Sequence, residues 1–164
     1  MIYMNSVGLP SQHDQNLNIL SVGLSKGIKL GNFGLKSNIV YQKVLKDSVI
    51  NIPEILGFAG VYYKNKIFDN NMDIQIGLDT RYRSKFKANG FIPSTGLFSV
   101  QNQKYIDEVF LFDGYLSFKV KRFRAFFRYT NIGSLFLNTS PYSLFNYPER
   151  PAALRFGFSW EFYN

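Results

Sequence analysis

The sequence predicts an all-β fold in which antiparallel strands form a transmembrane β-barrel, and three observations lead to this. Apolar and polar residues alternate along most of the chain, as in strands whose successive side chains point to opposite faces. The 164 residues include 17 Phe and 11 Tyr, and aromatic residues favour strands and membrane interfaces. Short and longer connections follow one another in turn, which is typical of membrane barrels.

The composition excludes several other classes of protein. The net charge of +8 is spread along the predicted strands rather than gathered in one block, which argues against a nucleic-acid-binding tail. The chain has no cysteine, so disulfide frameworks and Cys-ligated metals are excluded. No segment approaches the roughly 18 consecutive apolar residues of a membrane helix, so any membrane crossing has to use strands.

The first part of the chain predicts a weak strand and then a hairpin. Residues 2–7 carry the weak strand pattern, and the polar loop that follows holds the only histidine, His13, to which we assign no role. Residues 17–30 and 33–46 alternate clearly on either side of a glycine–asparagine pair that is typical of tight hairpin turns.

The middle of the chain predicts two strands, over residues 54–63 and 72–86, joined by a polar turn. The faces of the first are blurred by small residues, whereas the second has the clearest alternation in the chain. Its polar side carries five charges: Asp73, Asp79, Arg81, Arg83 and Lys85. A small soluble core could not satisfy them. The solvent face of a one-sided sheet and a water-filled interior both remain open, and a strand longer than the usual five or six residues favours the barrel.

The last part of the chain predicts three strands, over residues 108–121, 124–133 and 153–164. The closing strand has one polar and one fully apolar side. We expect its apolar side to face lipid and to act as the assembly signal of the barrel. These lipid-facing residues are Leu154, Phe156, Phe158, Trp160 and Phe162.

The predicted connections alternate in length. The connections at residues 31–32, 64–71 and 121–123 are classed as short, those at residues 8–16 and 47–53 as medium, and those at residues 87–107 and 134–151 as long. Outer-membrane barrels alternate short periplasmic turns with longer external loops in this way. The same parity makes residues 1–7 the upper end of a strand whose lower half is missing, and no leader peptide is visible. We therefore expect one barrel domain over residues 1–164, as about seven to eight strands at the C-terminal end of a larger barrel. The alternative is a complete eight-stranded barrel.

The charged residues of the polar sides are the candidate site, as the lining of a lumen. The predicted lumen-lining residues are Lys36, Asp79, Arg81, Arg83, Lys85, Asp113, Lys119, Arg124, Arg128, Arg155 and Glu161. Basic residues exceed acidic ones, which predicts an interior that favours anions; salt bridges filling a closed interior are the alternative. The sequence shows no nucleophile elbow, P-loop or histidine cluster. We therefore expect no enzymatic activity, no cofactor and no metal.

Three stretches resemble a known family. They are F-L-F-D-G-Y-L-S-F-K-V-K-R-F-R-A-F-F-R-Y-T-N at Phe110–Asn131, the closing Y-S-L-F-N-Y-P-E-R-P-A-A-L-R-F-G-F-S-W-E-F-Y-N, and G-L-D-T-R-Y-R-S-K-F-K-A-N-G-F at Gly77–Phe91. Together they resemble the C-terminal portion of the putative porin family of Bacteroidota outer membranes, over residues 55–164. The chain departs from the family in ending on Phe-Tyr-Asn and in being several times shorter. TonB-dependent receptors end in a similar aromatic strand.

The resemblance and the pattern together predict a porin-like channel of the outer membrane for passive diffusion of small solutes, with anions favoured. Two alternatives remain: a small closed eight-stranded barrel with a structural or adhesion role, and a soluble lipocalin-like ligand-binding barrel with an apolar interior. The expected partners are outer-membrane lipid and lipopolysaccharide, the barrel-assembly machinery, and other subunits or the rest of a longer barrel. Nucleic acid is not among them.

Overall fold

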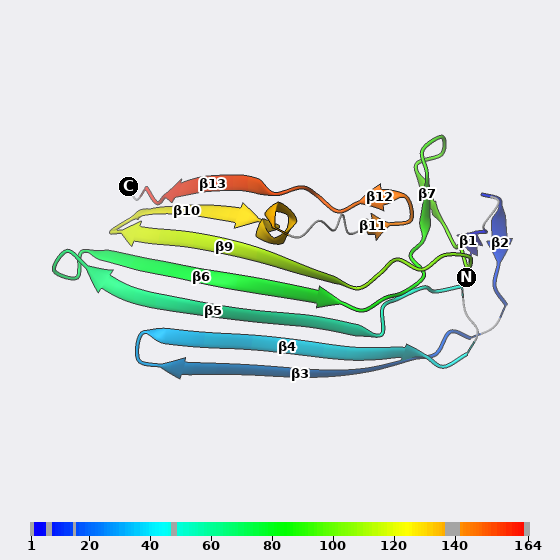
Figure 1. The fold of residues 1–164 in the computed structure, drawn as a ribbon, viewed down its shortest axis with the longest axis horizontal. Coiled ribbons are helices and arrows are strands. Elements are labelled where there is room, and N and C mark those ends of the chain that lie inside the picture. The colour runs from blue at the N-terminus through cyan, green and yellow to red at the C-terminus, as the bar shows by residue number, and fades with distance from the viewer. Residues whose placement is uncertain (1, 6–7, 15, 47–48, 137–141, 163–164) are drawn as a thin grey trace.

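A computed structural model describes residues 2–5, 8–14, 16–46, 49–136 and 142–162 of the chain. Seven long antiparallel strands form one sheet, in the order β13-β10-β9-β6-β5-β4-β3 (Figure 1). These strands are β3 (Ile19–Leu30), β4 (Phe33–Val44), β5 (Ile55–Ile67), β6 (Met72–Arg83), β9 (Val109–Val120), β10 (Phe123–Thr130) and β13 (Ala153–Trp160). The predicted all-β antiparallel architecture is thereby confirmed.

The remaining elements are short and lie at one end of the sheet. A small sheet joins β1 (Ile2–Met4), β2 (Pro10–Gln12), β7 (Gly90–Ile92) and β8 (Leu97–Ser99) at the right of Figure 1. Its β1–β8 pairing is parallel, unlike every pairing of the long strands. A 3₁₀ helix, η1 (Ile132–Leu135), and the strand pair β11 (Tyr142–Leu144) and β12 (Tyr147–Pro148) follow β10.

The predicted role of the N-terminal residues is wrong. They do not form the upper end of a strand in the long sheet. Instead, the chain reverses direction after β1, and β1 pairs with β2. The turn is closed by hydrogen bonds from the Asn5 backbone N–H to the Leu9 carbonyl, 2.9 Å, and from the Gly8 N–H to the Asn5 carbonyl, 2.9 Å. Gly8 takes the left-handed φ of 84°, which glycine adopts without steric cost. The pattern of a three-residue strand cannot reveal this reversal.

The predicted alternation of short and longer connections is confirmed, because the two kinds lie at opposite ends of the sheet. The short turns at residues 31–32, 68–71 and 121–122 lie at one end of the sheet, called here the turn end, and the long connections lie at the other, the loop end (Figure 1). Trp160, the last residue of β13, pairs with Phe123 beside the last short turn, so β13 finishes at the turn end.

The β5 strand is longer than predicted. Its pairing with β6 continues to Ile67↔Met72, so Lys64 and Lys66 belong to the strand rather than to a turn. On the other edge of β6, the pairing with β9 ends at Arg83, but the isolated bridge Phe86↔Ile106 continues the same register. With 12 or 13 residues each, β3, β4, β5, β6 and β9 therefore reach the roughly 9 to 11 residues that a tilted membrane strand requires, whereas β10 and β13 have 8 residues each.

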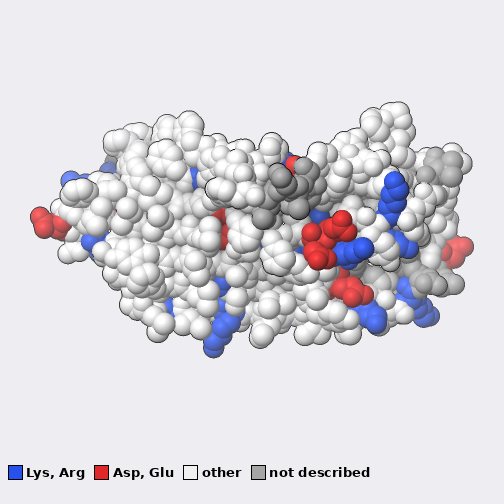
Figure 2. All heavy atoms as spheres, viewed as in Figure 1, with Lys and Arg blue, Asp and Glu red and all other residues white. Residues whose placement is uncertain are grey.

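The registers place apolar residues of all seven strands on one side, called here the apolar face. Its most exposed members include Val22, Leu24, Ile39, Val61, Ile76, Leu78, Phe110, Phe127, Leu154, Phe156, Phe158 and Trp160. Figure 2 shows a broad, largely uncharged surface, with charged groups toward its two ends and a few between them, including a basic group at its lower edge. Phe158 is 75% exposed. A contiguous apolar surface of this size requires an apolar environment or a partner.

No second layer packs on the long sheet in the part of the chain that the structure describes. Among the described residues, the buried apolar side chains are Ala88, Ile106 and Val109, all near the loop end. A soluble domain packs its sheet against another layer around a hydrophobic core. The backbone ladder thus holds this sheet together, and the apolar face remains uncovered.

The predicted barrel is not closed in the described part of the chain. One edge of β3 and one edge of β13 pair with no other described strand. Unpaired edges of long strands carry rows of free N–H and C=O groups that readily pair with another strand. These two edges are therefore where further strands would complete the sheet.

Candidate functional site

The opposite side of the sheet, called here the polar face, carries most of its charge. Ten cations of the long strands lie on it: Lys29, Lys36, Lys64, Lys66, Arg81, Arg83, Lys119, Arg124, Arg128 and Arg155. Three carboxylates share the same strands and face, Asp73, Asp79 and Asp113. By contrast, the charged residues that the long strands place on the apolar face are Lys26 and Lys43.

The structure brings the predicted lumen-lining residues together on this one face. Nine of the eleven lie within the long strands, as the list above shows. Lys85 and Glu161 lie just beyond β6 and β13: Lys85 pairs with Asp107 at 3.9 Å, and Glu161 pairs with Arg124 at 3.6 Å. The role of this face as the wall of a lumen remains a prediction.

A group of four residues at mid-height, called here the carboxylate cluster, contains two aspartates from neighbouring strands. Asp79 and Asp113 are directly opposite in the β6–β9 register, an arrangement that repels unless cations neutralise it. Arg128 bridges the two: its Nη2 donates to Asp79 Oδ2 at 3.0 Å, and its Nη1 lies 3.5 Å from Asp113 Oδ2. Arg81 Nη2 donates to Asp113 Oδ2 at 2.8 Å.

Asp113 is the most enclosed member of the carboxylate cluster. Its side chain is 2% exposed, and its second carboxylate oxygen accepts a hydrogen bond from the Asn131 backbone N–H at 2.9 Å. A buried carboxylate needs this full set of partners, because an unpaired buried charge costs several kcal/mol. The cluster consequently holds β6, β9 and β10 together.

Two tyrosines lie flat across neighbouring strands of the polar face. A Cβ built on Gly34 would lie 2.1 Å from the ring of Tyr62, and one on Gly77 would lie 2.6 Å from the ring of Tyr115. Glycine therefore makes room for each ring. Gln75 Nε2 donates to the Tyr115 hydroxyl at 2.8 Å, and the Arg128 guanidinium carbon lies 5.4 Å from the centroid of the same ring.

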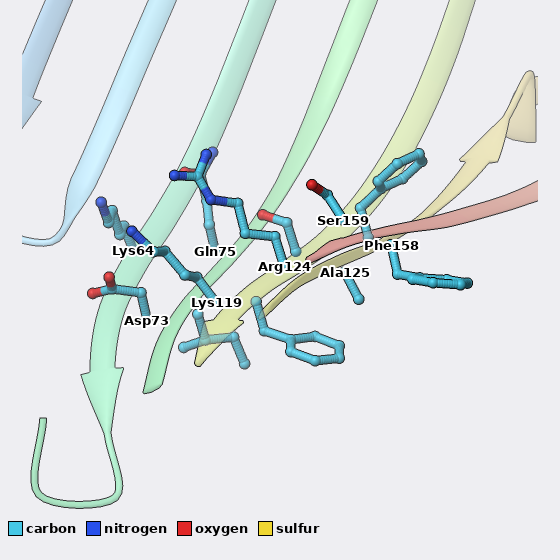
Figure 3. Close-up of a pocket in the computed structure, with 12 residues that line it drawn as sticks. Lys64, Asp73, Gln75, Lys119, Arg124, Ala125, Phe158 and Ser159 are labelled. Atoms are coloured by element: carbon cyan, nitrogen blue, oxygen red, sulfur yellow. The ribbon is translucent and has the colours of Figure 1, made fainter. Parts of the chain in front are cut away.

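A second polar region, called here the turn-end hollow, lies nearer the short turns. Its cations are Lys64 of β5, Lys119 of β9 and Arg124 of β10, and Asp73 and Gln75 of β6 lie between them in the sheet. The hollow has a volume of about 570 Å³. Figure 3 shows the three cationic side chains extending on the same side of the sheet.

Parts of the turn-end hollow and of the polar face around it could not be predicted from the sequence. Lys64 and Lys66 were assigned to a turn, although the run K-N-K-I at residues 64–67 continues the alternation of a strand. Gln75 and Tyr115 were placed on strands without a role. Their hydrogen bond depends on the β6–β9 register, which the separate patterns of the two strands do not contain.

At the loop end, the polar face meets the long connections. The Arg83 guanidinium donates to the Tyr142 carbonyl of β11 at 2.6 Å, so the connection after β10 reaches the polar side of the sheet. Two more connections are joined by a hydrogen bond of 2.8 Å from Asn51 Nδ2 to the Gln101 carbonyl. The loops thus contact the sheet and one another at this end.

No group of three His, Asp or Glu side chains in the described part of the chain is arranged to bind a metal ion. No helix among the same residues is both long and apolar enough to cross a membrane.

Comparisons with known proteins give one match. Neither curated proteins nor solved structures show a match to the chain. A family model described as "Putative porin" matches residues 1–164, the whole length of the chain. The chain therefore belongs to the putative porin family.

Proposed function

We propose that the protein is a porin-like channel of the outer membrane that lets small hydrated solutes diffuse passively, without enzymatic activity or a cofactor. The observation that carries this is the division of one single-layered sheet into two faces. All seven long strands turn apolar side chains to one side and place charges on the other. A membrane barrel needs this division, with lipid outside and water inside.

The proposal requires that the sheet be closed. In a bilayer, every backbone N–H and C=O group has to be hydrogen-bonded within the protein, because lipid offers no partner. The free edges of β3 and β13 would be joined by further strands, either from the rest of a longer barrel or from other subunits. Outer-membrane lipid and lipopolysaccharide would cover the apolar face, and the barrel-assembly machinery would recognise the aromatic β13.

We propose further that the channel favours anions. Ten cations against three carboxylates on the polar face of the long strands would give the lumen a positive potential. Rings of basic side chains favour anions in pores because their field attracts the anion and repels cations.

A closed barrel with a structural role is the second candidate. It is favoured by the carboxylate cluster, in which Arg81, Arg128, Asp79 and Asp113 neutralise one another. Such a network can fill a narrow interior instead of lining an open one.

Planar-bilayer recording of the complete protein separates the two candidates. A porin is expected to give ohmic conductance steps. In a KCl gradient, the reversal potential is expected to have the sign that indicates selectivity for chloride over potassium. Folded protein that inserts into the bilayer and carries no current would contradict the channel. A reversal potential that indicates cation selectivity would contradict the anion preference but not the channel.

A further inference from the structure

We propose that the turn-end hollow is a binding site for a small dissolved oxyanion of the phosphate class. The inference deepens the proposed function, on which it rests for the direction in which the polar face points. It would give the channel a discrete anion site in addition to a general positive field.

The cations of the hollow come from three strands and converge. Lys119 and Arg124 are directly opposite in the β9–β10 register, and Lys64 extends from β5 to the same hollow. Like charges directly opposite one another destabilise a sheet. An anion seated between them would remove that repulsion.

The described carboxylates leave two of these cations without an ion pair, although Asp73 is opposite Lys119 in the β6–β9 register. Neither Lys64 nor Lys119 has a carboxylate within 4.0 Å among the described residues, and Arg124 has Glu161 at 3.6 Å, with both side chains about half exposed. In the carboxylate cluster, by contrast, every cation has an aspartate partner at 2.8 or 3.0 Å. Lys64 and Lys119 are thus available to a ligand.

The other groups of the hollow suit an oxyanion. Ser117 and Ser159 border it with hydroxyl groups, and Gln75 borders it with an amide. These groups and the cations can donate hydrogen bonds to several oxygens of one ligand, and charge-assisted hydrogen bonds are the strongest of this kind. Phe126, whose ring lies across Gly157, supplies an apolar wall.

Asp73 specifies the ligand further. Its Oδ1 atom is buried and accepts no hydrogen bond from the described residues. A fully deprotonated anion would be repelled by this carboxylate, whereas the P–OH group of monohydrogen phosphate can donate to it. The hollow therefore combines cations for the charge of the ligand with one acceptor for its proton.

Lysine labelling tests the site without requiring any current. The complete protein, purified in an uncharged sugar detergent, is labelled briefly with acetic anhydride, in sodium phosphate or in sodium chloride of equal ionic strength. Mass spectrometry then compares the labelling rates of single lysines. Phosphate is expected to slow the labelling of Lys64 and Lys119 by about threefold or more, since binding excludes the reagent. Lys85, paired with Asp107 beyond β6, is the matched control and is expected to be unchanged.

A second arm separates dissolved phosphate from a lipid headgroup. Phosphatidylglycerol is added to the detergent in place of inorganic phosphate. Protection of Lys64 and Lys119 by the lipid alone would overturn the assignment to a dissolved solute, as would equal labelling in phosphate and chloride. Protection by inorganic phosphate supports it.

Conductance distinguishes a failure of the site from a failure of the channel. In a conducting protein, inorganic phosphate is expected to reduce the chloride current, and the double variant K64Q/K119Q is expected to need roughly tenfold more phosphate for the same reduction. The variant K26Q removes a cation from the apolar face and is expected to behave as the unmodified protein. Phosphate protection without any current would retain the site and refute the channel. A current that phosphate reduces equally in all three proteins would refute the site and retain the channel.

Discussion

Two regions of the polar face, the carboxylate cluster and the turn-end hollow, have similar side chains and differ in how their charges are paired. In the cluster, two arginines and two aspartates alternate at 2.8 to 3.5 Å. In the hollow, Lys119 and Arg124 lie side by side. The difference teaches that the role of a charged region depends on how its charges are paired and not on how many charges its strands carry.

Burial explains why the two regions differ. Asp113 is 2% exposed, so its charge requires partners, and the partners have to be in fixed positions. Arg124 is 56% exposed, and near water the repulsion between like charges is weak enough to be tolerated. We therefore assign the cluster to stability and the hollow to binding.

The substitution Asp113→Asn is the strongest test of the stability role. It removes the charge that faces Arg81 and Arg128 and retains an acceptor for the Asn131 N–H. We expect the free energy of unfolding to fall by about 3 kcal/mol, the lower end for a broken buried pair, because Arg81 is half exposed and regains water. Urea unfolding of the complete protein in micelles measures the change, with K85Q as a control expected to cost less than about 0.5 kcal/mol. An equal loss in both variants would contradict the distinction between the two regions.

Sequence alone predicted the two faces and the parity of the connections, because both depend on local signals. A period of two assigns each residue of β6, β9 and β13 to a face, and turn residues mark the connections. The pairing of Asp79 with Asp113 was not predictable. The β6–β9 connection spans residues 84–108, and a long connection does not set a register in the way that a two-residue turn does.

The small sheet at the loop end escaped prediction for a different reason. Its strands β1, β2, β7 and β8 have three residues each, which is too short for an alternating pattern to be recognised. The faces of β5 were also unclear, because small residues such as Gly57, Ala59 and Gly60 weaken the contrast between its sides. The carboxylate cluster and the turn-end hollow likewise depend on the register between neighbouring strands, which the pattern of a single strand does not contain.

The substitution Gly77→Ala tests how the two regions are connected. The added Cβ would meet the Tyr115 ring at 2.6 Å, displacing the tyrosine from both Gln75 and Arg128. We expect a loss of about 1–3 kcal/mol in unfolding free energy, typical of overpacking. Gly27→Ala is the matched control, because a Cβ there meets its nearest neighbour at 4.0 Å. Equal stability of the two variants would show that the ring position is unimportant.

The substitution Lys119→Gln is expected to change stability in the opposite direction to Asp113→Asn. It removes the like charge opposite Arg124 and the cation opposite Asp73. Because Lys119 forms no ion pair with Asp73 within 4.0 Å in the described part of the chain, the lost repulsion should prevail, and the unfolding free energy should rise by about 0.2–1 kcal/mol at low salt. The gain should shrink as salt is added, because the Debye length falls to about 10 Å at 0.1 M. Urea unfolding at two salt concentrations measures both effects. A loss of stability at low salt would mean that the attraction of Lys119 to Asp73 outweighs its repulsion from Arg124.

The substitution Asp73→Asn should leave stability almost unchanged and alter the choice of ligand. Asp73 Oδ1 has no donor among the described residues, so losing its charge breaks no hydrogen bond. Sulfate lacks the proton that monohydrogen phosphate can donate to this carboxylate, so the unmodified protein is expected to be protected from lysine labelling more strongly by phosphate than by sulfate. The Asn side chain offers an amide that can donate to either anion, and the two anions should then protect Lys64 and Lys119 equally. If phosphate still protects the lysines more strongly than sulfate in the Asn variant, Asp73 does not accept a hydrogen bond from the phosphate proton. The preference for phosphate would then come from the cations alone.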